Sequence, residues 1–300
     1  MTSIRDAATV VVVRPGDKGL ETYMLRRHGD HEFMARVWVF PGGGLDDQDR
    51  RAASNQDRFD LSPRRAARQL GIDDGPTALA IICCAIRETF EEAGILLAQV
   101  AGDDAPISFR DPQRRRDFRQ IRTAVDEGQC SLLDVAHRRN LLLAARRLHY
   151  FAHWITPHFE SRRYDTHFFV ARHPPGQTAS HDDGETTHGR WWSAKRAIAA
   201  YRDGDIELAP PTLRILEQLR GFSSIPKFFA DIDQRPQPPT ILPAVGEATG
   251  DSDATLLLPG DPDYPSADPE FAVATPVRDG VTRIVRRRDQ WFSIGDGDRH

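Results

Sequence analysis

The stretch RETFEEAGI (residues 87–95) holds three glutamates within five positions and closes on a glycine followed by isoleucine. Apolar side chains recur at helical spacing before and through it, namely Leu79, Ile82, Ile86, Phe90 and Ala93. This periodicity predicts a helix over residues 77–93, ended by the glycine. At about 100° per residue, Glu88, Glu91 and Glu92 share one face of that helix while the apolar stripe faces a core.

Three carboxylates this close repel one another unless a cation compensates their charge. Hard oxygen ligands are those that Mg²⁺ or Mn²⁺ prefer, so the pattern favours a divalent metal site. The plainer interpretation is a solvated acidic helix end, in which Arg87 pairs with Glu91 four positions on. Ile81 and Cys84 argue against it, because they put less polar side chains on the carboxylate side of the helix.

A glycine loop precedes the helix in the stretch VFPGGGLDDQD (residues 39–49). Glycine has no side chain, so backbone can approach a ligand or a metal ion closely there. A glycine loop beside an acidic helix indicates a site for a polyphosphate bridged by metal ions.

The rest of the chain alternates between strand and helix patterns, which predicts an α/β fold. Runs of β-branched and aromatic residues predict strands over 8–13, 21–28, 36–40, 95–100, 149–156, 163–172 and 189–193. Helices are predicted from Ser62, with Pro63 at the first helical position, and over 111–127, 136–148, 194–201 and 211–219. The first two strands should form a hairpin, and 149–156 should lie beside 163–172.

The segment 87–95 resembles the second half of the Nudix box, G-x5-E-x7-R-E-U-x-E-E-x-G-U, and departs from it only at Thr89. The first half has its counterpart in Gly43, five residues and then Asp49 in place of glutamate. The family has seven residues between the halves, whereas 37 residues stand here. A split box, the FPGGGLD loop and RRYDTHFF (162–169) resemble the branch that includes peroxisomal coenzyme A diphosphatases, and the resemblance covers about residues 6–220.

This resemblance implies a Nudix α/β/α sandwich around a mixed β-sheet, interrupted by an insertion inside the Nudix box at about residues 50–79. It also implies that Glu88, Glu91 and Glu92 bind the divalent cations, Mg²⁺ or Mn²⁺. Arg87 would hold a box glutamate by an ion pair, and the Gly43 region would supply a backbone carbonyl ligand and contact the substrate. Because aspartate replaces the first box glutamate at position 49, its role of bracing the helix is left open.

The implied activity is hydrolysis of a pyrophosphate bond in a nucleoside diphosphate linked to another moiety. Metal ions neutralise the anionic bridge and lower the pKa of a bound water, and a carboxylate takes the proton. The family uses no fixed base, so the role stays open between a box glutamate and an acid of the loop that contains Asp182, Asp183 and Glu185. An ordinary polar loop is the alternative for these three.

Arginines are the candidate phosphate contacts. Arg26 and Arg27 lie on a strand and point to opposite faces. Arg27 is the candidate substrate contact, and the alternative is a side chain that merely covers the sheet. Arg162 and Arg163 could grip the additional phosphate of a coenzyme A-like ligand, or could form a turn. His149, His153 and His167 are interpreted as structural strand residues in preference to metal ligands. One of Trp191 and Trp192 could stack on an adenine ring, and at least one of them is interpreted as core.

The bulk composition fits a globular protein and excludes several classes. The net charge is −4 at pH 7, so no global basic field attracts nucleic acid, and residues 110–122 and 283–288 are the locally basic runs. Three cysteines without metal spacing favour a reducing compartment, and we expect a cytoplasmic protein without a membrane segment. The expected partner is a small nucleoside diphosphate derivative; a homodimer is left open.

Composition changes near residue 232, so we expect a Nudix hydrolase domain over 1–232 and a proline-rich linker with a β-rich C-terminal extension over 233–300. The insertion should form a lid or substrate wall beside the active site. The substrate is coenzyme A or acyl-coenzyme A by resemblance, with ADP-ribose or a dinucleotide as the alternative. A non-catalytic Nudix-like ligand sensor is the alternative of another class, and the three intact glutamates disfavour it.

Overall fold

A computed structural model describes residues 4–17, 19–27, 37–181, 186–248, 250 and 252–295. Within these ranges the main sheet has nine strands in the order β10-β3-β2-β1-β8-β7-β11, with β4 added to β1 and β9 added to β2. These strands are β1 (Ile4–Gly16), β2 (Gly19–Arg27), β3 (Val37–Val39), β4 (Gly42–Gly44), β7 (His149–Ile155), β8 (Arg163–Arg172), β9 (Thr186–Ser193), β10 (Glu207–Leu208) and β11 (Thr240–Ile241).

The sheet is mixed: β1 runs parallel to β8 but antiparallel to β2, and β7 runs antiparallel to β8. Strand β1 is its centre, because the uninterrupted run Val10–Val13 is fully buried on both faces. The predicted hairpin and the adjacency of 149–156 and 163–172 are therefore confirmed.

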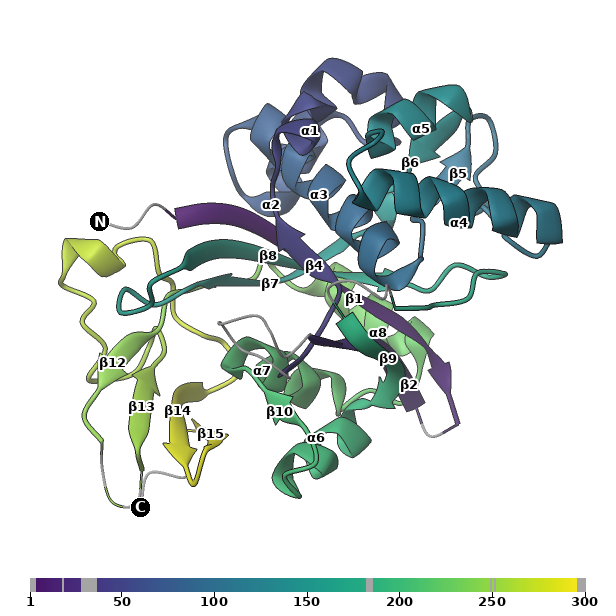
Figure 1. Cartoon of the computed structure of the whole chain (residues 1–300). Coiled ribbons are helices and arrows are strands. Elements are labelled where there is room, and N and C mark those ends of the chain that lie inside the picture. The colour runs from purple at the N-terminus through teal and green to yellow at the C-terminus, as the bar shows by residue number, and fades with distance from the viewer. Residues whose placement is uncertain are drawn as a thin grey trace.

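Helices cover both faces of the sheet, which confirms the sandwich (Figure 1). On one face lie α1 (Asp47–Arg50), a 3-10 helix (Arg51–Arg58), α2 (Pro63–Leu70), α3 (Gly75–Ala93), α4 (Pro112–Asp126) and α5 (Leu132–Arg138). On the other lie α6 (Ala194–Arg202), α7 (Pro210–Leu219) and α8 (Ile225–Gln234). Residues alternate between the two cores along β1, with Val10 and Val12 in the first and Val11 and Val13 in the second.

One predicted helix is wrong. Residues 136–148 divide into the end of α5, strand β6 (Leu141–Leu143) and a 3-10 turn (Ala145–Arg147). Asn140 breaks the helix with a φ of 51°, and β6 then pairs with β5 (Ala98–Val100). Leucine and alanine suit a helix, but here the tertiary pairing with β5 overrides that preference.

The insertion does not form the expected lid. The insertion begins beside the glycine loop and then packs against α3, where Phe59, Ala66 and Leu70 are buried in the first core. None of residues 50–79, all of which the structure describes, lines the cavity that α3 faces. The apolar side chains of the insertion explain this position. The amphipathic α2 is stabilised more by burying its apolar face against α3 than by covering a polar cavity.

The C-terminal region is β-rich, with β12 (Ala244–Gly246), β13 (Ala254–Leu257), β14 (Val281–Arg287) and β15 (Gln290–Gly295) in a separate sheet and a 3-10 turn at Pro269–Phe271. It is not detached from the rest, because β11 pairs with β7. Leu256, Leu258 and Ile284 also join the second core. In the ranges described above, no single helix is long and apolar enough to cross a membrane, and only the bent pair α2 and α3 reaches that length and composition together.

Candidate active site

Helix α3 presents the carboxylates, and both of its ends are fixed. The Asp74 side chain accepts a hydrogen bond from the backbone N–H of Thr77 at the start. Gly94 ends the helix with a φ of 64°, which favours glycine. From α4, Arg122 donates to the Glu91 carbonyl oxygen at 2.7 Å. The basic run 110–122 thus contributes one contact that holds the C-terminal end of α3.

Arg87 is the centre of a buried charge cluster. Its Nη1 donates to Glu88 Oε1 at 2.9 Å and to Glu91 Oε2 at 2.7 Å. Its Nη2 donates to the carbonyl oxygen of Gly44 at 3.2 Å. The guanidinium therefore orients two glutamates and also ties the glycine loop to α3.

Asp49 completes this cluster and takes the bracing role that the sequence left open. It receives two hydrogen bonds from Arg87, at 3.0 Å from Nε and 2.7 Å from Nη2, and its side chain is fully buried. A capping box with Asp46 begins α1 and holds Asp49 in place. Asp49 reaches Arg87 although its side chain is short, because α1 packs against α3.

The glycine loop lies directly against the carboxylates. The backbone N–H of Gly42 donates to Glu92 Oε2 at 2.8 Å. A Cβ on Gly43 would lie 2.5 Å from Glu88 Oε1, so no other residue fits there without displacing that carboxylate. Thr89, the one departure from the box, is buried and donates to the Ala85 carbonyl oxygen at 2.7 Å, so its hydroxyl is satisfied within the helix.

Burial of the carboxylates opposes their ionisation. Burial, with a further contribution from the Glu91 charge, raises the pKa of Glu88 to about 7, although Arg87 acts in the opposite direction. Burial likewise raises the pKa of Glu91. Arg87 carries one positive charge and contacts three carboxylates, those of Asp49, Glu88 and Glu91, so it compensates their negative charge only in part.

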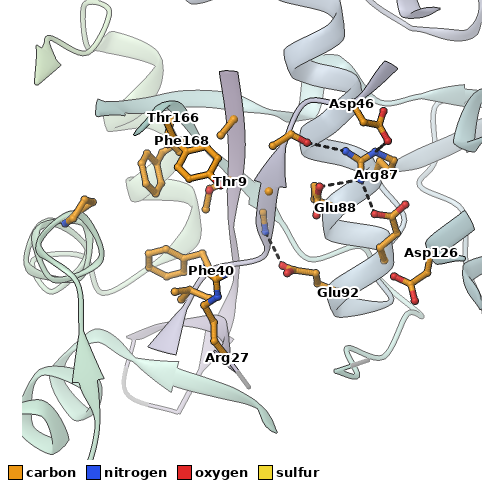
Figure 2. Close-up of a pocket in the computed structure, with 18 of the residues that line it drawn as sticks. Thr9, Arg27, Phe40, Asp46, Arg87, Glu88, Glu92, Asp126, Thr166 and Phe168 are labelled. Atoms are coloured by element: carbon orange, nitrogen blue, oxygen red, sulfur yellow. Dashed lines mark hydrogen bonds and ion pairs between the residues drawn. The ribbon is translucent and has the colours of Figure 1, made fainter. Parts of the chain in front are cut away.

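These groups line one wall of a cavity of about 600 Å³ (Figure 2). Gly42, Gly43 and Gly44 lie beside Glu88, Glu91 and Glu92. Thr9, Arg27, Phe40, Thr166 and Phe168 lie across from the carboxylates, and Ala209, Pro211 and Thr212 from the start of α7 also reach the cavity. The lining has an anionic wall, three arginines (Arg27, Arg87 and Arg162) and an apolar side, and a cavity of this size suits a nucleotide-sized ligand.

Of the arginines expected to contact the substrate, two line the cavity and one does not. Arg27 and Arg162 both line the cavity. Arg163 does not: it is buried on the other face of the strand, where its Nε donates to the Thr156 carbonyl oxygen at 3.0 Å. Neighbouring residues on a strand point to opposite faces, so the substrate role expected for Arg163 is withdrawn.

Of two further groups of candidate residues, one lies elsewhere in the fold, and the other lies outside the residues that the structure describes. Trp191 packs on Tyr23 and Trp192 packs edge-on against Trp38, and neither lines the cavity. Residues Asp182, Asp183 and Glu185 lie outside the described residues. Glu185 therefore stays a candidate base on sequence alone.

The structure adds a carboxylate that the sequence did not single out. Asp126, at the end of α4, lines the same cavity and is one cause of the raised pKa of Glu91. Tyr164, Thr166 and Phe168 line it from β8, on the same face as Arg162. Alternation along RRYDTHFF could have indicated these three, whereas nothing in the local sequence places Asp126 beside α3.

The donor set fits a divalent cation. Carboxylate oxygens of α3 and the backbone of a glycine loop meet where a side chain at position 43 would collide with Glu88. Burial raises the pKa values of Glu88 and Glu91, and the single charge of Arg87 is shared among Glu88, Glu91 and Asp49, a situation that a hard cation relieves.

Comparison with known proteins agrees with this geometry. The family described as the NUDT19 Nudix domain matches residues 4–219. A crystal structure of a NUDIX hydrolase from Alicyclobacillus acidocaldarius superimposes with a TM-score of 0.59 at 24% identity, over 77% of this chain and 97% of that one. That likeness concerns the fold.

Three curated relatives are each described as acyl-coenzyme A diphosphatase NUDT19. The Xenopus laevis protein is 26% identical, over 84% of this chain and 73% of its own length. The Gallus gallus protein is 32% identical, over 65% and 55%, and the Homo sapiens protein is 28% identical, over 70% and 63%. The chain thus spans between about half and three quarters of the length of these relatives.

Proposed function

We propose that the chain, which belongs to the Nudix hydrolase family, hydrolyses coenzyme A or acyl-coenzyme A. It is a pyrophosphohydrolase whose NUDT19-type domain covers residues 4–219. One observation carries the proposal: the α3 carboxylates and two arginines, Arg27 and Arg162, line one cavity. Names of the relatives support the same substrate class.

Glu88, Glu91 and Glu92 would hold the divalent cation, with a backbone carbonyl of the Gly43 region. When bound, Mg²⁺ or Mn²⁺ supplies charge neutralisation at the pyrophosphate and lowers the pKa of water. Arg87 keeps Glu88 and Glu91 in position by donating to both.

The rest of the cavity suits the rest of the ligand. Arg27, across from the carboxylates, and Arg162, which lines the same cavity, can contact phosphate oxygens. Phe40, Phe168 and Pro211 offer apolar surface for a pantetheine or acyl chain. Asp126 joins the box glutamates and Glu185 as a candidate to take the proton from the attacking water.

The test is a substrate panel with purified protein and Mg²⁺ or Mn²⁺, comparing coenzyme A, an acyl-coenzyme A, ADP-ribose and a dinucleotide. We expect coenzyme A to give 4′-phosphopantetheine and adenosine 3′,5′-bisphosphate. Faster turnover of ADP-ribose would replace the substrate assignment while leaving the Nudix chemistry in place. Binding without turnover of any substrate would favour a ligand sensor.

A further inference from the structure

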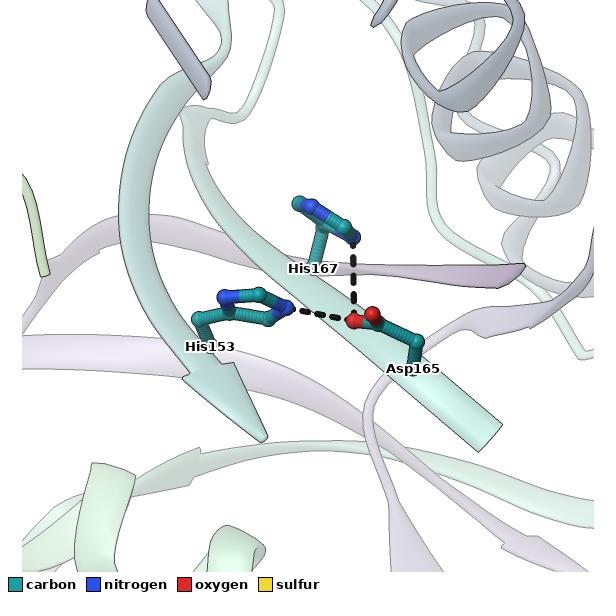
Figure 3. Close-up of side chains that lie close together, drawn as sticks. All are labelled: His153, Asp165 and His167. Atoms are coloured by element: carbon teal, nitrogen blue, oxygen red, sulfur yellow. Dashed lines mark hydrogen bonds and ion pairs between the residues drawn. The ribbon is translucent and has the colours of Figure 1, made fainter. Parts of the chain in front are cut away.

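A second polar cluster lies on the other face of β8 from the cavity. His153 of β7 and His167 of β8 are direct cross-strand partners, and Asp165 stands two residues before His167 (Figure 3). Residues two apart on a strand share a face. Thr166 and Phe168, between and after them, face the cavity instead.

The three side chains converge on a small volume. One ligand atom from each lies within 4.8 Å of the others. His153 Nε2 contacts Asp165 Oδ1, and His167 Nδ1 lies 3.8 Å from the same oxygen. Ligand atoms about 2.0–2.2 Å from a tetrahedral zinc ion lie roughly 3.3 Å apart, so small side-chain shifts would complete the geometry.

His167 lacks the partners that a buried imidazole needs. Its side chain is 4% exposed, and neither ring nitrogen has a hydrogen-bond partner among the described residues. The ring lies between His153, at 4.3 Å between centroids, and Tyr150, at 5.5 Å. A buried polar atom left unsatisfied costs about 1–3 kcal/mol, and an ion that uses the lone pair removes that penalty.

The orientation of His153 also suits a metal ligand. Its Nδ1 lies 3.0 Å from the hydroxyl oxygen of Thr240 on β11. With the proton on Nδ1 and donated to Thr240, the Nε2 lone pair faces Asp165 and His167. Metal-binding histidines are commonly held by such a hydrogen bond from the other ring nitrogen.

We propose that His153, Asp165 and His167 form a second metal site, which takes Zn²⁺ or a similar transition metal ion. Two imidazoles and one carboxylate match zinc better than Mg²⁺, which prefers oxygen ligands alone. Asp165, with 27% of its side chain exposed, gives the ion access from solvent and leaves a position for water. The bound ion joins β7 to β8 and, through Thr240, to the C-terminal region.

The test uses the full chain in which Glu88→Gln and Glu92→Gln remove two of the three α3 carboxylates and so weaken the cation site of the cavity. Binding of Zn²⁺ is measured by calorimetry, and Co²⁺ is used as a spectroscopic substitute. We expect one equivalent of Zn²⁺ and an intense visible Co²⁺ band, because four-coordinate sites with nitrogen ligands absorb far more strongly than six-coordinate oxygen sites. Zn²⁺ should also raise the unfolding temperature.

Single substitutions then locate the site. His153→Gln and His167→Gln should abolish the band and weaken zinc binding by more than about 100-fold, while Thr240→Val should weaken it by about 10–100-fold. His149→Gln removes an imidazole from the same strand and should change neither. If His167→Gln does not unfold cooperatively, His153→Gln decides. Zinc binding of equal strength in His153→Gln, or only a weak six-coordinate Co²⁺ spectrum, would overturn the proposal.

Discussion

The two faces of β8 carry different chemistry although their residues alternate along one strand. On one face, Thr166 and Phe168 line an open cavity together with Arg162, just before the strand, and the carboxylates of α3. Asp165 and His167 face the interior, where a second histidine meets them. The oxygen-rich cavity suits a hard cation that substrate and water must reach, and the more deeply buried cluster with two imidazoles suits an ion that joins two strands.

The largest expected effect separates the two sites by activity. Glu92→Gln should lower kcat/KM by about 10³-fold or more, because a catalytic metal supplies several kcal/mol and each 1.4 kcal/mol is tenfold. Its fold should persist, since the amide oxygen can still accept from Gly42. His153→Gln should change kcat/KM by less than about tenfold. Steady-state kinetics on coenzyme A measures both, and full activity of Glu92→Gln or after exhaustive chelation would contradict the catalytic assignment.

The second prediction concerns stability at the cavity side. Asp49→Asn leaves the buried Arg87 without its fully buried partner and should lower the free energy of unfolding by about 3–5 kcal/mol. Asp47→Asn, at an exposed position of the same short helix, should change it by less than about 0.5 kcal/mol. Urea unfolding measures both. Equal small effects would mean that Asp49 does not brace α3.

The third prediction uses pH in metal-free protein. Burial raises the pKa of Glu88 from 4.5 to about 7, so the folded state binds more protons than the unfolded state between those values. The contribution of Glu88 to stability is therefore complete below pH 4.5 and is lost as pH rises toward 7, by on the order of 2–3 kcal/mol. Glu88→Gln should flatten this part of the unfolding profile, and Mg²⁺ should restore stability near pH 7 in the wild type alone. A pH profile unchanged by Glu88→Gln would contradict the shift.

The smallest expected effect tests the alternation of β8 itself. Arg162→Ala should weaken turnover of coenzyme A about 10–100-fold more than turnover of its 3′-dephospho form, since a charged phosphate contact contributes about 1.5–3 kcal/mol. Arg163→Ala loses the hydrogen bond to Thr156 inside the protein and should affect both substrates alike. Equal losses in Arg162→Ala would place the additional phosphate elsewhere in the cavity.

The parts of the fold that depend on the periodic spacing of nearby residues could be predicted from the sequence. Helix α3, the long strand β1 and the β7–β8 pair follow from residue spacing, and the carboxylate face follows from the wheel of α3. The end of α5 and strand β6 could not, because Leu141–Leu143 becomes a strand only by pairing with β5. That partner lies about 40 residues earlier and leaves no local mark.

The same holds for the candidate site: only the residues that local spacing brings together could be predicted. The box residues converge as their spacing indicates, whereas Asp126 depends on how α4 packs beside α3. The cluster of His153, Asp165 and His167 depends on the register between two strands, which the order of residues alone does not fix. The sequence interpretation treated the three histidines as structural strand residues and did not predict that His153 and His167 lie side by side.

The pairing of β11 with β7 bears on how the chain behaves when shortened. In the described residues β11 lies at the end of the main sheet, so it covers backbone donors and acceptors of β7 beside His153 and Trp154. A chain that stopped at residue 232 would leave that edge open, next to the apolar surface that Leu256, Leu258 and Ile284 now cover. An uncovered edge of this kind recruits strands from other molecules, so the shortened protein should self-associate and precipitate even with every catalytic residue in place.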